Sequence, residues 1–314
     1  MDAGIIIQVV LLLVGFVFLI KGSDFFVDGA SSIASILKVP TLIVGLTIVA
    51  MGTSAPEAAV SITSSLTGSN AMAVSNVIGS NLFNMLMVIG VAALLSELLM
   101  EKKVLKKDLP FLVGITLLFA IFIFIGGDIT NIEGIILLLI LAAYIIYLVR
   151  DARKGKEGND VEKPKFSLPK SVLLIVVGLA GIILGGDLVV DSASAIAIAF
   201  GMSETLVGLT IVAIGTSLPE LVTSITALKK GENQLVIGNV IGSNIFNILF
   251  VLGASSAISA IPVASNMLID VVFMMIVTVI CFIFGKTQDK YDKKEGIILI
   301  ALFIAYMIFA ILRN

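Results

Sequence analysis

Two thirteen-residue segments of nearly identical sequence constrain the fold of this chain more than any other feature. Residues 45–57 and 208–220 differ at only two positions, and each is an apolar helical run that leads into Gly-Thr-Ser, a proline and a glutamate. Proline lacks an N–H group, and its ring crowds the carbonyl four residues earlier. Pro56 and Pro219 therefore predict a broken helix in each segment, with that carbonyl released from the helical pattern.

The composition places these broken helices in a membrane. Hydrophobic residues make up 59% of the 314 residues and charged residues only 13%, an apolar share well above that of soluble domains. The length suits about ten spans of roughly 20 residues each. We therefore predict an all-α, polytopic membrane protein with ten transmembrane helices. The expected spans are 5–35, 41–66, 71–97, 109–126, 130–149, 171–199, 205–228, 234–261, 267–284 and 295–312.

The residue types that are missing exclude several classes of function. The chain has no histidine and a single cysteine, Cys281, so zinc sites built on histidine, Ser–His nucleophiles and disulfide frameworks are excluded. An intramembrane hydrolase that uses Ser54 or Ser217 would lack a histidine or nearby lysine as its base. We expect no enzyme, no cofactor and no nucleic-acid partner.

A constant offset of 163 residues relates the two halves of the chain. It pairs Thr53 with Thr216, and it pairs residues 76–84 with 239–247, which are identical at eight of nine positions. It also pairs two acidic doublets, Asp24 and Asp28 with Asp187 and Asp191. One ungapped offset across three elements indicates an internal repeat.

The repeat predicts two halves of opposite orientation within one membrane domain. Residues 1–149 and 171–314 each carry five expected spans, and residues 150–170 form a polar linker. Because five is odd, the second half enters the membrane from the other side. Inverted repeats of this kind characterise transporters that bind substrate near the bilayer midplane, between two broken helices.

Basic residues predict the orientation in a cell membrane. Eighteen of the 20 Lys and Arg residues fall in the odd-numbered connections, counted from the first span, and the even-numbered connections hold none. Positive charge is retained on the cytoplasmic side. We therefore expect a cytoplasmic linker at 150–170 and external termini.

Two carboxylates and a set of hydroxyl and amide groups form the candidate site. Glu57 and Glu220 are the only acids within their spans, and an ionisable residue inside a membrane is functional by default. Thr, Ser and Asn oxygens beside them are hard donors, which Ca²⁺ prefers. The hydroxyls could instead bond back to a helix carbonyl, and Gly79 and Gly242 suit close helix packing. The acidic doublets suit either a cation entrance or solvated helix ends.

The paired Gly-Thr-Ser-x-Pro-Glu and Gly-Ser-Asn-x-Phe-Asn motifs resemble the α-repeats of the calcium/cation antiporter superfamily, here a prokaryotic member. The resemblance implies a ten-helix fold in which the long first and sixth helices slide as a gate. It also implies a central site between the second, third, seventh and eighth helices. The implied ligands are the carboxylates of Glu57 and Glu220; groups of Thr53, Ser54, Thr216 and Ser217; the carbonyls of Ala50 and Ala213; and the side chains of Ser80, Asn84, Ser243 and Asn247.

The resemblance implies antiport of Ca²⁺ against a monovalent ion, by alternating access in a lipid bilayer. We expect the monomer to be the working unit. Asn247 stands where the K⁺-dependent branch carries Asp, which argues against K⁺ dependence. Two glutamates are neutralised by one Ca²⁺ or two protons, which favours H⁺ as the counter-ion for Ca²⁺ export. Na⁺/Ca²⁺ exchange is the alternative. A cation channel with the same acidic residues is a third interpretation, disfavoured by the inverted repeats.

Overall fold

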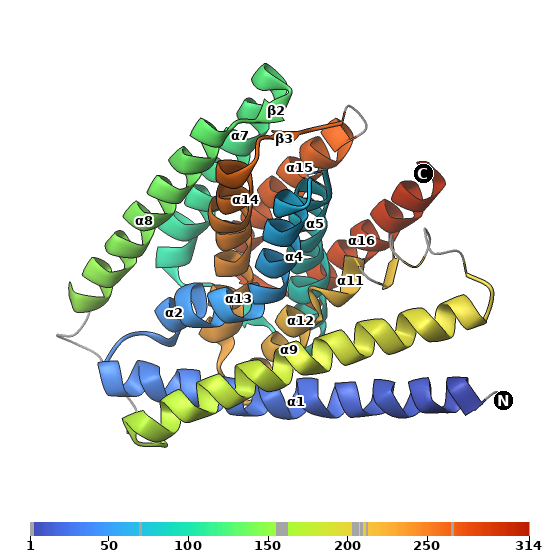
Figure 1. The fold of residues 1–314 in the computed structure, drawn as a ribbon. Helices are drawn as coiled ribbons and strands as arrows, with labels where there is room; N and C mark the ends of the chain where they lie inside the picture. The colour runs from blue at the N-terminus through green and yellow to red at the C-terminus, as the bar shows by residue number, and fades with distance from the viewer. Residues whose placement is uncertain are drawn as a thin grey trace.

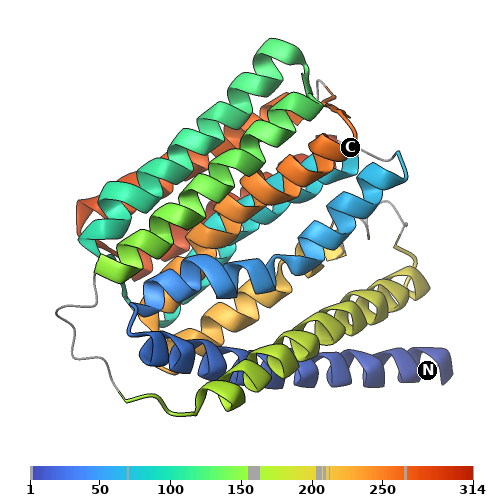
Figure 2. The same cartoon turned by 60° about the vertical axis from the view of Figure 1, so that its left-hand side comes forward.

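Two long helices lie side by side across the other helices in the computed structural model. They are α1 (Ala3–Leu37) and α9 (Leu168–Ala199), and they run in opposite directions along each other (Figure 1, Figure 2). The structure describes residues 3–68, 71–154, 163–202, 207, 210–211, 213–264 and 267–313. Because α1 and α9 occupy equivalent places in the two repeats, their antiparallel arrangement agrees with inverted halves.

The remaining elements of the first half pack above this pair. They are α2 (Thr41–Val44), π-helical η1 (Gly45–Val49), α3 (Ala50–Thr53), α4 (Ala55–Leu66), α5 (Ala71–Phe83), π-helical η2 (Asn84–Val88), α6 (Ile89–Leu95), β1 (Leu98–Leu99), π-helical η3 (Val104–Asp108), α7 (Leu109–Gly126), β2 (Asp128–Ile129) and α8 (Asn131–Lys154).

The second half repeats this order. Its described elements after α9 are α11 (Ala213–Gly215), α12 (Leu218–Lys229), α13 (Asn233–Phe246), π-helical η6 (Asn247–Leu252), α14 (Gly253–Ile258), β3 (Ile261–Pro262), α15 (Met267–Thr287), β4 (Lys290–Tyr291) and α16 (Lys293–Arg313). β1 pairs with β4 and β2 with β3, both antiparallel. The repeat relates one strand pair to the other, so they tie the halves together symmetrically.

Eight of the ten predicted spans correspond to continuous apolar helices of the described residues and differ from them only at their ends. Among the described residues, eight helices are long and apolar enough to cross a membrane, and the pair 41–53 and 55–66, bent by 49° at its break, counts as a ninth if it is taken as one span. The break predicted at Pro56 is therefore confirmed. The predicted span 205–228 lies partly outside the described residues, so only α11 and α12 represent it. The two strand pairs were not predicted, because each strand has only two residues.

Small residues allow α1 and α9 to approach closely. A methyl group added at Gly22 would lie 2.7 Å from the carbonyl oxygen of Gly178 and 2.7 Å from the amide nitrogen of Ile182. One added at Gly15 would lie 3.0 Å from the carbonyl oxygen of Gly185. Lipid offers no hydrophobic drive between helices, so van der Waals contact across such a seam stabilises their association.

We expect Gly22→Ala to lower the melting temperature of the purified protein, and Gly4→Ala to leave it unchanged or raise it. Both changes put alanine in α1 and gain about 1 kcal/mol of helix propensity. A methyl at Gly4 meets nothing within 4 Å, whereas one at Gly22 meets backbone, and overpacking costs about 1–3 kcal/mol. Thermal unfolding followed by circular dichroism measures the difference. Equal melting temperatures for the two variants would contradict close backbone packing between α1 and α9 at Gly22.

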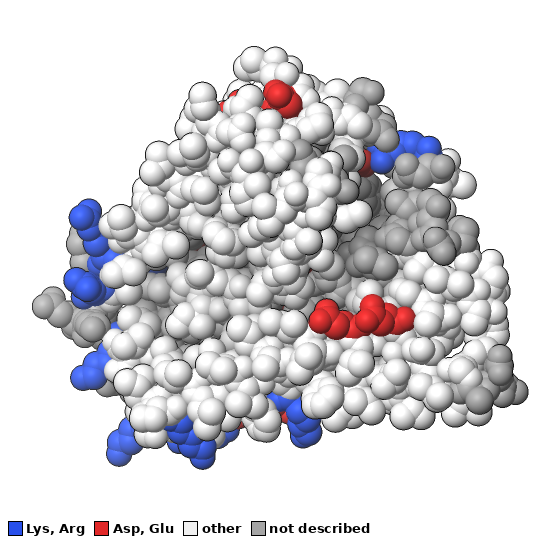
Figure 3. Space-filling model, viewed as in Figure 1, with Lys and Arg blue, Asp and Glu red and all other residues white. Residues whose placement is uncertain are grey.

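The two acidic doublets lie in different surroundings. Lys230 lies 3.6 Å from Asp24 and 3.0 Å from Asp28, and Lys165 lies 3.2 Å from Asp28. Asp187 and Asp191 are exposed on α9, and Figure 3 shows acidic side chains gathered along that helix, away from the Lys and Arg residues at the lower left. The first doublet therefore ties α1 to α12 and the linker, while the second faces outward.

Candidate functional site

The two glutamates lie in the first turn of the helices that follow the breaks. Glu57 is on α4 and Glu220 on α12, and both side chains are fully buried. The N-terminus of a helix carries partial positive charge that favours a nearby carboxylate. The break predicted at each proline therefore explains how a carboxylate is held inside an apolar protein.

Each glutamate accepts a hydrogen bond from the break of the other half. The Ser217 hydroxyl donates to Glu57 Oε1 at 3.1 Å, and the Ser54 hydroxyl donates to Glu220 Oε1 at 3.0 Å. The internal repeat relates one bond to the other, because Ser54 corresponds to Ser217 and Glu57 to Glu220. The two broken helices therefore meet at one site rather than forming two separate ones.

Helices α5 and α13 supply the neighbouring polar groups. The Ser80 hydroxyl donates to Glu57 Oε1 at 3.0 Å and lies 2.8 Å from the Ser217 hydroxyl. The Asn247 amide donates to Ser80 Oγ at 3.2 Å, and Ser243 lies 3.3 Å from the Thr53 hydroxyl. Four helices, α4, α5, α12 and α13, thus converge on the glutamates.

Asn84 and Asn247 begin equivalent π-helical turns, η2 and η6. Such turns within α-helices are frequent at functional sites. The side-chain nitrogen of Asn84 donates to Asn244 Oδ1 at 3.2 Å, and that of Asn247 donates to Asn81 Oδ1 at 3.1 Å. These bonds hold the nitrogen end of each amide, which leaves each Asn carbonyl oxygen available for another partner.

Four buried oxygens of the site have no hydrogen-bond partner in the described part of the chain. They are Oε2 of Glu57, Oε2 of Glu220, Oδ1 of Asn84 and Oδ1 of Asn247. An unsatisfied buried polar atom is destabilising by about 1–3 kcal/mol, and more for a charged group. The four form two symmetric pairs of hard donors with two carboxylates among them. Carboxylate and amide oxygens are the kind of ligand that Ca²⁺ prefers.

The remaining predicted site residues also lie at the breaks. The Thr53 hydroxyl donates to Asn239 Oδ1 at 3.0 Å, and that of Thr216 to Asn76 Oδ1 at 3.5 Å. The Ala50 carbonyl accepts the Ser54 N–H at 3.0 Å. The threonine hydroxyls thus brace each break against the other half, while the side chain of Ala213 lies outside the described residues.

One expectation about the breaks needs correction. The carbonyl of Gly52, four residues before Pro56, is not left without a partner, because a backbone N–H at the end of α3 donates to it. The helix tightens in its last turn and recovers the bond that proline removes. The unpartnered oxygens described above belong to side chains.

Sequence reasoning missed four asparagines that support the site. The Asn76 amide donates to the Glu57 carbonyl at 3.2 Å and to Ser61, and Asn239 makes the equivalent contacts with the Glu220 carbonyl, at 3.5 Å, and Ser224. Asn81 and Asn244 donate to each other's carbonyls at 3.5 and 3.4 Å. Helical spacing alone places Asn81 on a different face of its helix from Ser80, one position round. Its place in the repeated nine-residue motif was the signal available.

Comparisons with known proteins cover nearly the whole chain. A family model described as sodium/calcium exchanger protein matches residues 7–150 and 170–312. A protein of Alkalimonas amylolytica named as antiporter CaxA is 39% identical over 96% of this chain and 98% of its own length. The sodium/calcium exchanger MaX1 of Methanosarcina acetivorans is 33% identical over 97% and 98%. The solved structure of the sodium-calcium exchanger NCX_Mj, soaked with Na⁺ and Sr²⁺, has a TM-score of 0.85 and 31% identity over 96% of this chain and 98% of that one.

Proposed function

Because this chain belongs to the sodium/calcium exchanger protein family, we propose that it exports Ca²⁺ from the cytoplasm in exchange for a monovalent cation. It is a multi-pass membrane protein and a member of the calcium/cation antiporters. The observation that carries the proposal is the set of four unpartnered, buried oxygens on Glu57, Glu220, Asn84 and Asn247. Ca²⁺ bonded to them replaces missing hydrogen bonds and cancels two negative charges.

Contacts of the long helices with the breaks support alternating access. A methyl added at Gly52 would lie 2.6 Å from the ring of Phe26 on α1, and one added at Gly215 would lie 2.1 Å from the side chain of Val190 on α9. The Ser23 hydroxyl on α1 lies 3.3 Å from that of Thr223 on α12. Movement of α1 and α9 together therefore changes the packing at both breaks. This change opens the site to one side of the membrane and then to the other.

Protons are the first candidate for the counter-ion. Among the described residues, no group of three or more acidic, Cys or His side chains is placed to hold a metal ion, so the site charge comes from two glutamates. Two protons neutralise these as completely as one Ca²⁺. Proton binding and Ca²⁺ binding then exclude each other, which is the coupling that antiport requires.

Sodium is the second candidate, and one observation favours it. MaX1 and NCX_Mj are both named as sodium/calcium exchangers, and each resembles this chain over nearly its whole length. In this version of the proposal, Na⁺ ions use the same oxygens and displace Ca²⁺ by competition.

Inverted vesicles that contain the purified protein distinguish the two ions. We expect Ca²⁺ uptake when a gradient of the true counter-ion is imposed in the opposite direction, and no uptake when neither gradient is present. A pH gradient that drives uptake with choline in place of Na⁺ identifies H⁺; a Na⁺ gradient that drives it at equal pH identifies Na⁺. Uptake that continues without either gradient would identify a channel and contradict antiport.

The proposed orientation places the basic connections in the cytoplasm. Most of the Lys and Arg residues visible in Figure 3 lie along the left and lower edges of the molecule, with a further basic group at the upper right, and much of the remaining visible surface is uncharged. On a Cys281→Ala background, we expect cysteines at Lys103 and Lys230 to react with an impermeant thiol reagent only from the cytoplasm, and a cysteine at Thr130 only from outside. External labelling of either lysine position would contradict the orientation.

A further inference from the structure

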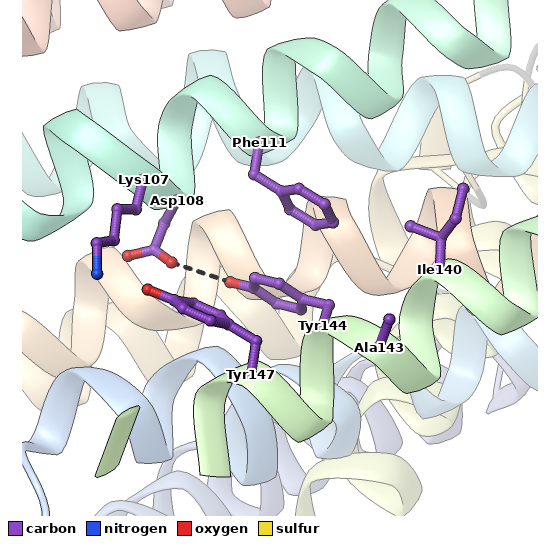
Figure 4. A pocket seen from close by; sticks show the side chains of 7 residues that line it. All are labelled: Lys107, Asp108, Phe111, Ile140, Ala143, Tyr144 and Tyr147. Carbon is purple, nitrogen blue, oxygen red and sulfur yellow. Dashed lines mark hydrogen bonds between the residues drawn. The ribbon is translucent and has the colours of Figure 1, made fainter. Parts of the chain in front are cut away.

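A groove between α7 and α8 contains a buried carboxylate oxygen that the described chain does not satisfy. The groove has a volume of about 440 Å³, and its lining includes Asp108, Phe111, Tyr144 and Tyr147. The Asp108 side chain is fully buried, and its Oδ1 accepts a hydrogen bond from the Tyr144 hydroxyl at 3.2 Å (Figure 4). Its Oδ2 has no partner among the described residues.

The second repeat holds the same arrangement with that oxygen satisfied. Beyond the first three spans of each half the offset between the repeats is 162 residues instead of 163, so Asp270, Phe273 and Tyr306 are the counterparts of Asp108, Phe111 and Tyr144. The Tyr306 hydroxyl donates to Asp270 Oδ1 at 3.2 Å, and the ring of Tyr306 stacks on Phe273 at 4.9 Å, as Tyr144 stacks on Phe111 at 4.5 Å. The two triads are therefore equivalent parts of the inverted halves.

The two triads differ in the cation that faces the carboxylate. Arg313 donates to both oxygens of Asp270, at 3.0 and 2.8 Å. The position equivalent to Arg313 is Asp151, which pairs with Lys103 and lies 3.7 Å from Lys107. In the first repeat Lys103 and Lys107 are the cations nearest to Asp108, but neither donates a hydrogen bond to its Oδ2. The second repeat therefore indicates what this oxygen lacks: a cationic hydrogen-bond donor in the place of the guanidinium.

The walls of the groove exclude a bare metal ion as that partner. Ca²⁺ and Mg²⁺ require six or more oxygen ligands, whereas the groove is lined mainly by aromatic and aliphatic side chains around one carboxylate. Aromatic faces beside a carboxylate suit an organic ammonium group. The α8 wall of the groove belongs to a candidate membrane span, on which the apolar residues Leu139 and Ile146 are 65% and 52% exposed.

Lys107 adds a site for an anion at the edge of the groove. Its side chain is 52% exposed and lies beside Asp108 and Tyr147, with the ammonium nitrogen 5.4 Å from the Tyr147 ring (Figure 4). An ammonium bound at Asp108 and a phosphate bound at Lys107 belong together in an aminophospholipid headgroup. The apolar wall formed by Phe111, Ile140 and Ala143 then receives the start of an acyl chain.

We propose that the α7–α8 groove binds phosphatidylethanolamine from the membrane, with its primary ammonium on Asp108 Oδ2 and its phosphate on Lys107. The ammonium takes the place that the Arg313 guanidinium fills in the other repeat. A rotation of the exposed Lys107 side chain opens the path to the carboxylate and brings the lysine to the phosphate. The bound lipid thereby completes the packing between α7 and α8.

Native mass spectrometry of the delipidated protein tests this site with three lipids of equal chain length. We expect phosphatidylethanolamine to bind at least about fivefold more than phosphatidylglycerol, which has no ammonium, and phosphatidylcholine, whose quaternary ammonium cannot donate a hydrogen bond. Soluble phosphoethanolamine should compete with phosphatidylethanolamine for the site, because the proposed contacts are all with the headgroup. Equal binding of the three lipids would overturn the proposal.

Three variants assign the binding to this groove. We expect Asp108→Asn to remove the preference for phosphatidylethanolamine, and Asp270→Asn, its counterpart in the second repeat, to preserve it. Asp151→Arg installs the residue found at the equivalent position of the second repeat, so it should exclude the lipid while Asp108 remains. Unchanged lipid preference in Asp108→Asn, or in a folded Asp151→Arg protein, would show that the carboxylate does not hold the headgroup. Size-exclusion profiles establish that each variant is folded.

Discussion

Replacing Glu57 or Glu220 with Gln reduces Ca²⁺ transport to background while the protein remains folded. Gln keeps the shape of the side chain and can still accept from Ser217 or Ser54, the donors in the present structure. It removes one of the two negative charges of a fully buried site. A single hydrogen bond to a charged group contributes about 1.5–3 kcal/mol, which is about a tenfold to hundredfold change in affinity, and direct bonding to a divalent ion exceeds it.

Transport by each variant in vesicles and its melting temperature together test this expectation. Glu101→Gln is the matched control, because it removes one carboxylate from the connection before η3, away from the site. We expect the control to transport at the normal rate. Transport near the normal rate in Glu57→Gln or Glu220→Gln would contradict the role of both carboxylates, because the repeat makes them equivalent.

Replacing Asn247 with Ala weakens Ca²⁺ binding by about tenfold to hundredfold. The substitution removes Oδ1, one of the four unpartnered oxygens, and also the amide bonds to Ser80 and Asn81 that hold the first turn of η6. Loss of a ligand and loss of the contacts that hold η6 both lower the affinity for Ca²⁺. At metal sites, loss of such supporting contacts alone lowers the affinity by about tenfold to hundredfold.

Asn247→Asp is the informative companion because it retains an oxygen ligand and adds a charge. We expect it to bind Ca²⁺ more tightly than Asn247→Ala at alkaline pH. Its affinity should then fall as pH decreases, since protons and Ca²⁺ compete for a third carboxylate. Isothermal titration of Ca²⁺ at several pH values measures both effects. Affinities in both variants equal to that of the unaltered protein would exclude Asn247 from the site.

Local sequence rules predicted the parts of the site that one residue determines. Pro56 interrupts a continuous helix through residues 41–66 and is accommodated only in the first turn of the helix that follows, so the break was predictable, whereas its 49° angle was not. The presence of Glu57 and Glu220 in buried helices followed from their isolation in apolar segments and from the repeat. These inferences need no knowledge of which helices touch.

Local sequence rules could not predict the contacts between the two halves. The sequence predicts that Ser54 and Ser217 lie near glutamates, but the structure is needed to show that each serves the glutamate of the other half. Helical spacing within one helix places Asn81 on a different face from Ser80. The α5–α13 contact gives its amide a partner, the Asn244 carbonyl, that no spacing within one helix could reveal. Likewise, the aspartate doublets looked equivalent, and only the fold places Lys230 beside one of them.

Anomalous diffraction from crystals of the protein soaked with Ca²⁺ tests most directly whether both repeats build one ion site. The account predicts one strong peak between the breaks, about 2.3–2.6 Å from oxygens of Glu57, Glu220, Asn84 and Asn247, and its loss in the Glu57→Gln, Glu220→Gln double variant. A peak elsewhere, such as beside the exposed Asp187 and Asp191, with none between the glutamates, would contradict it.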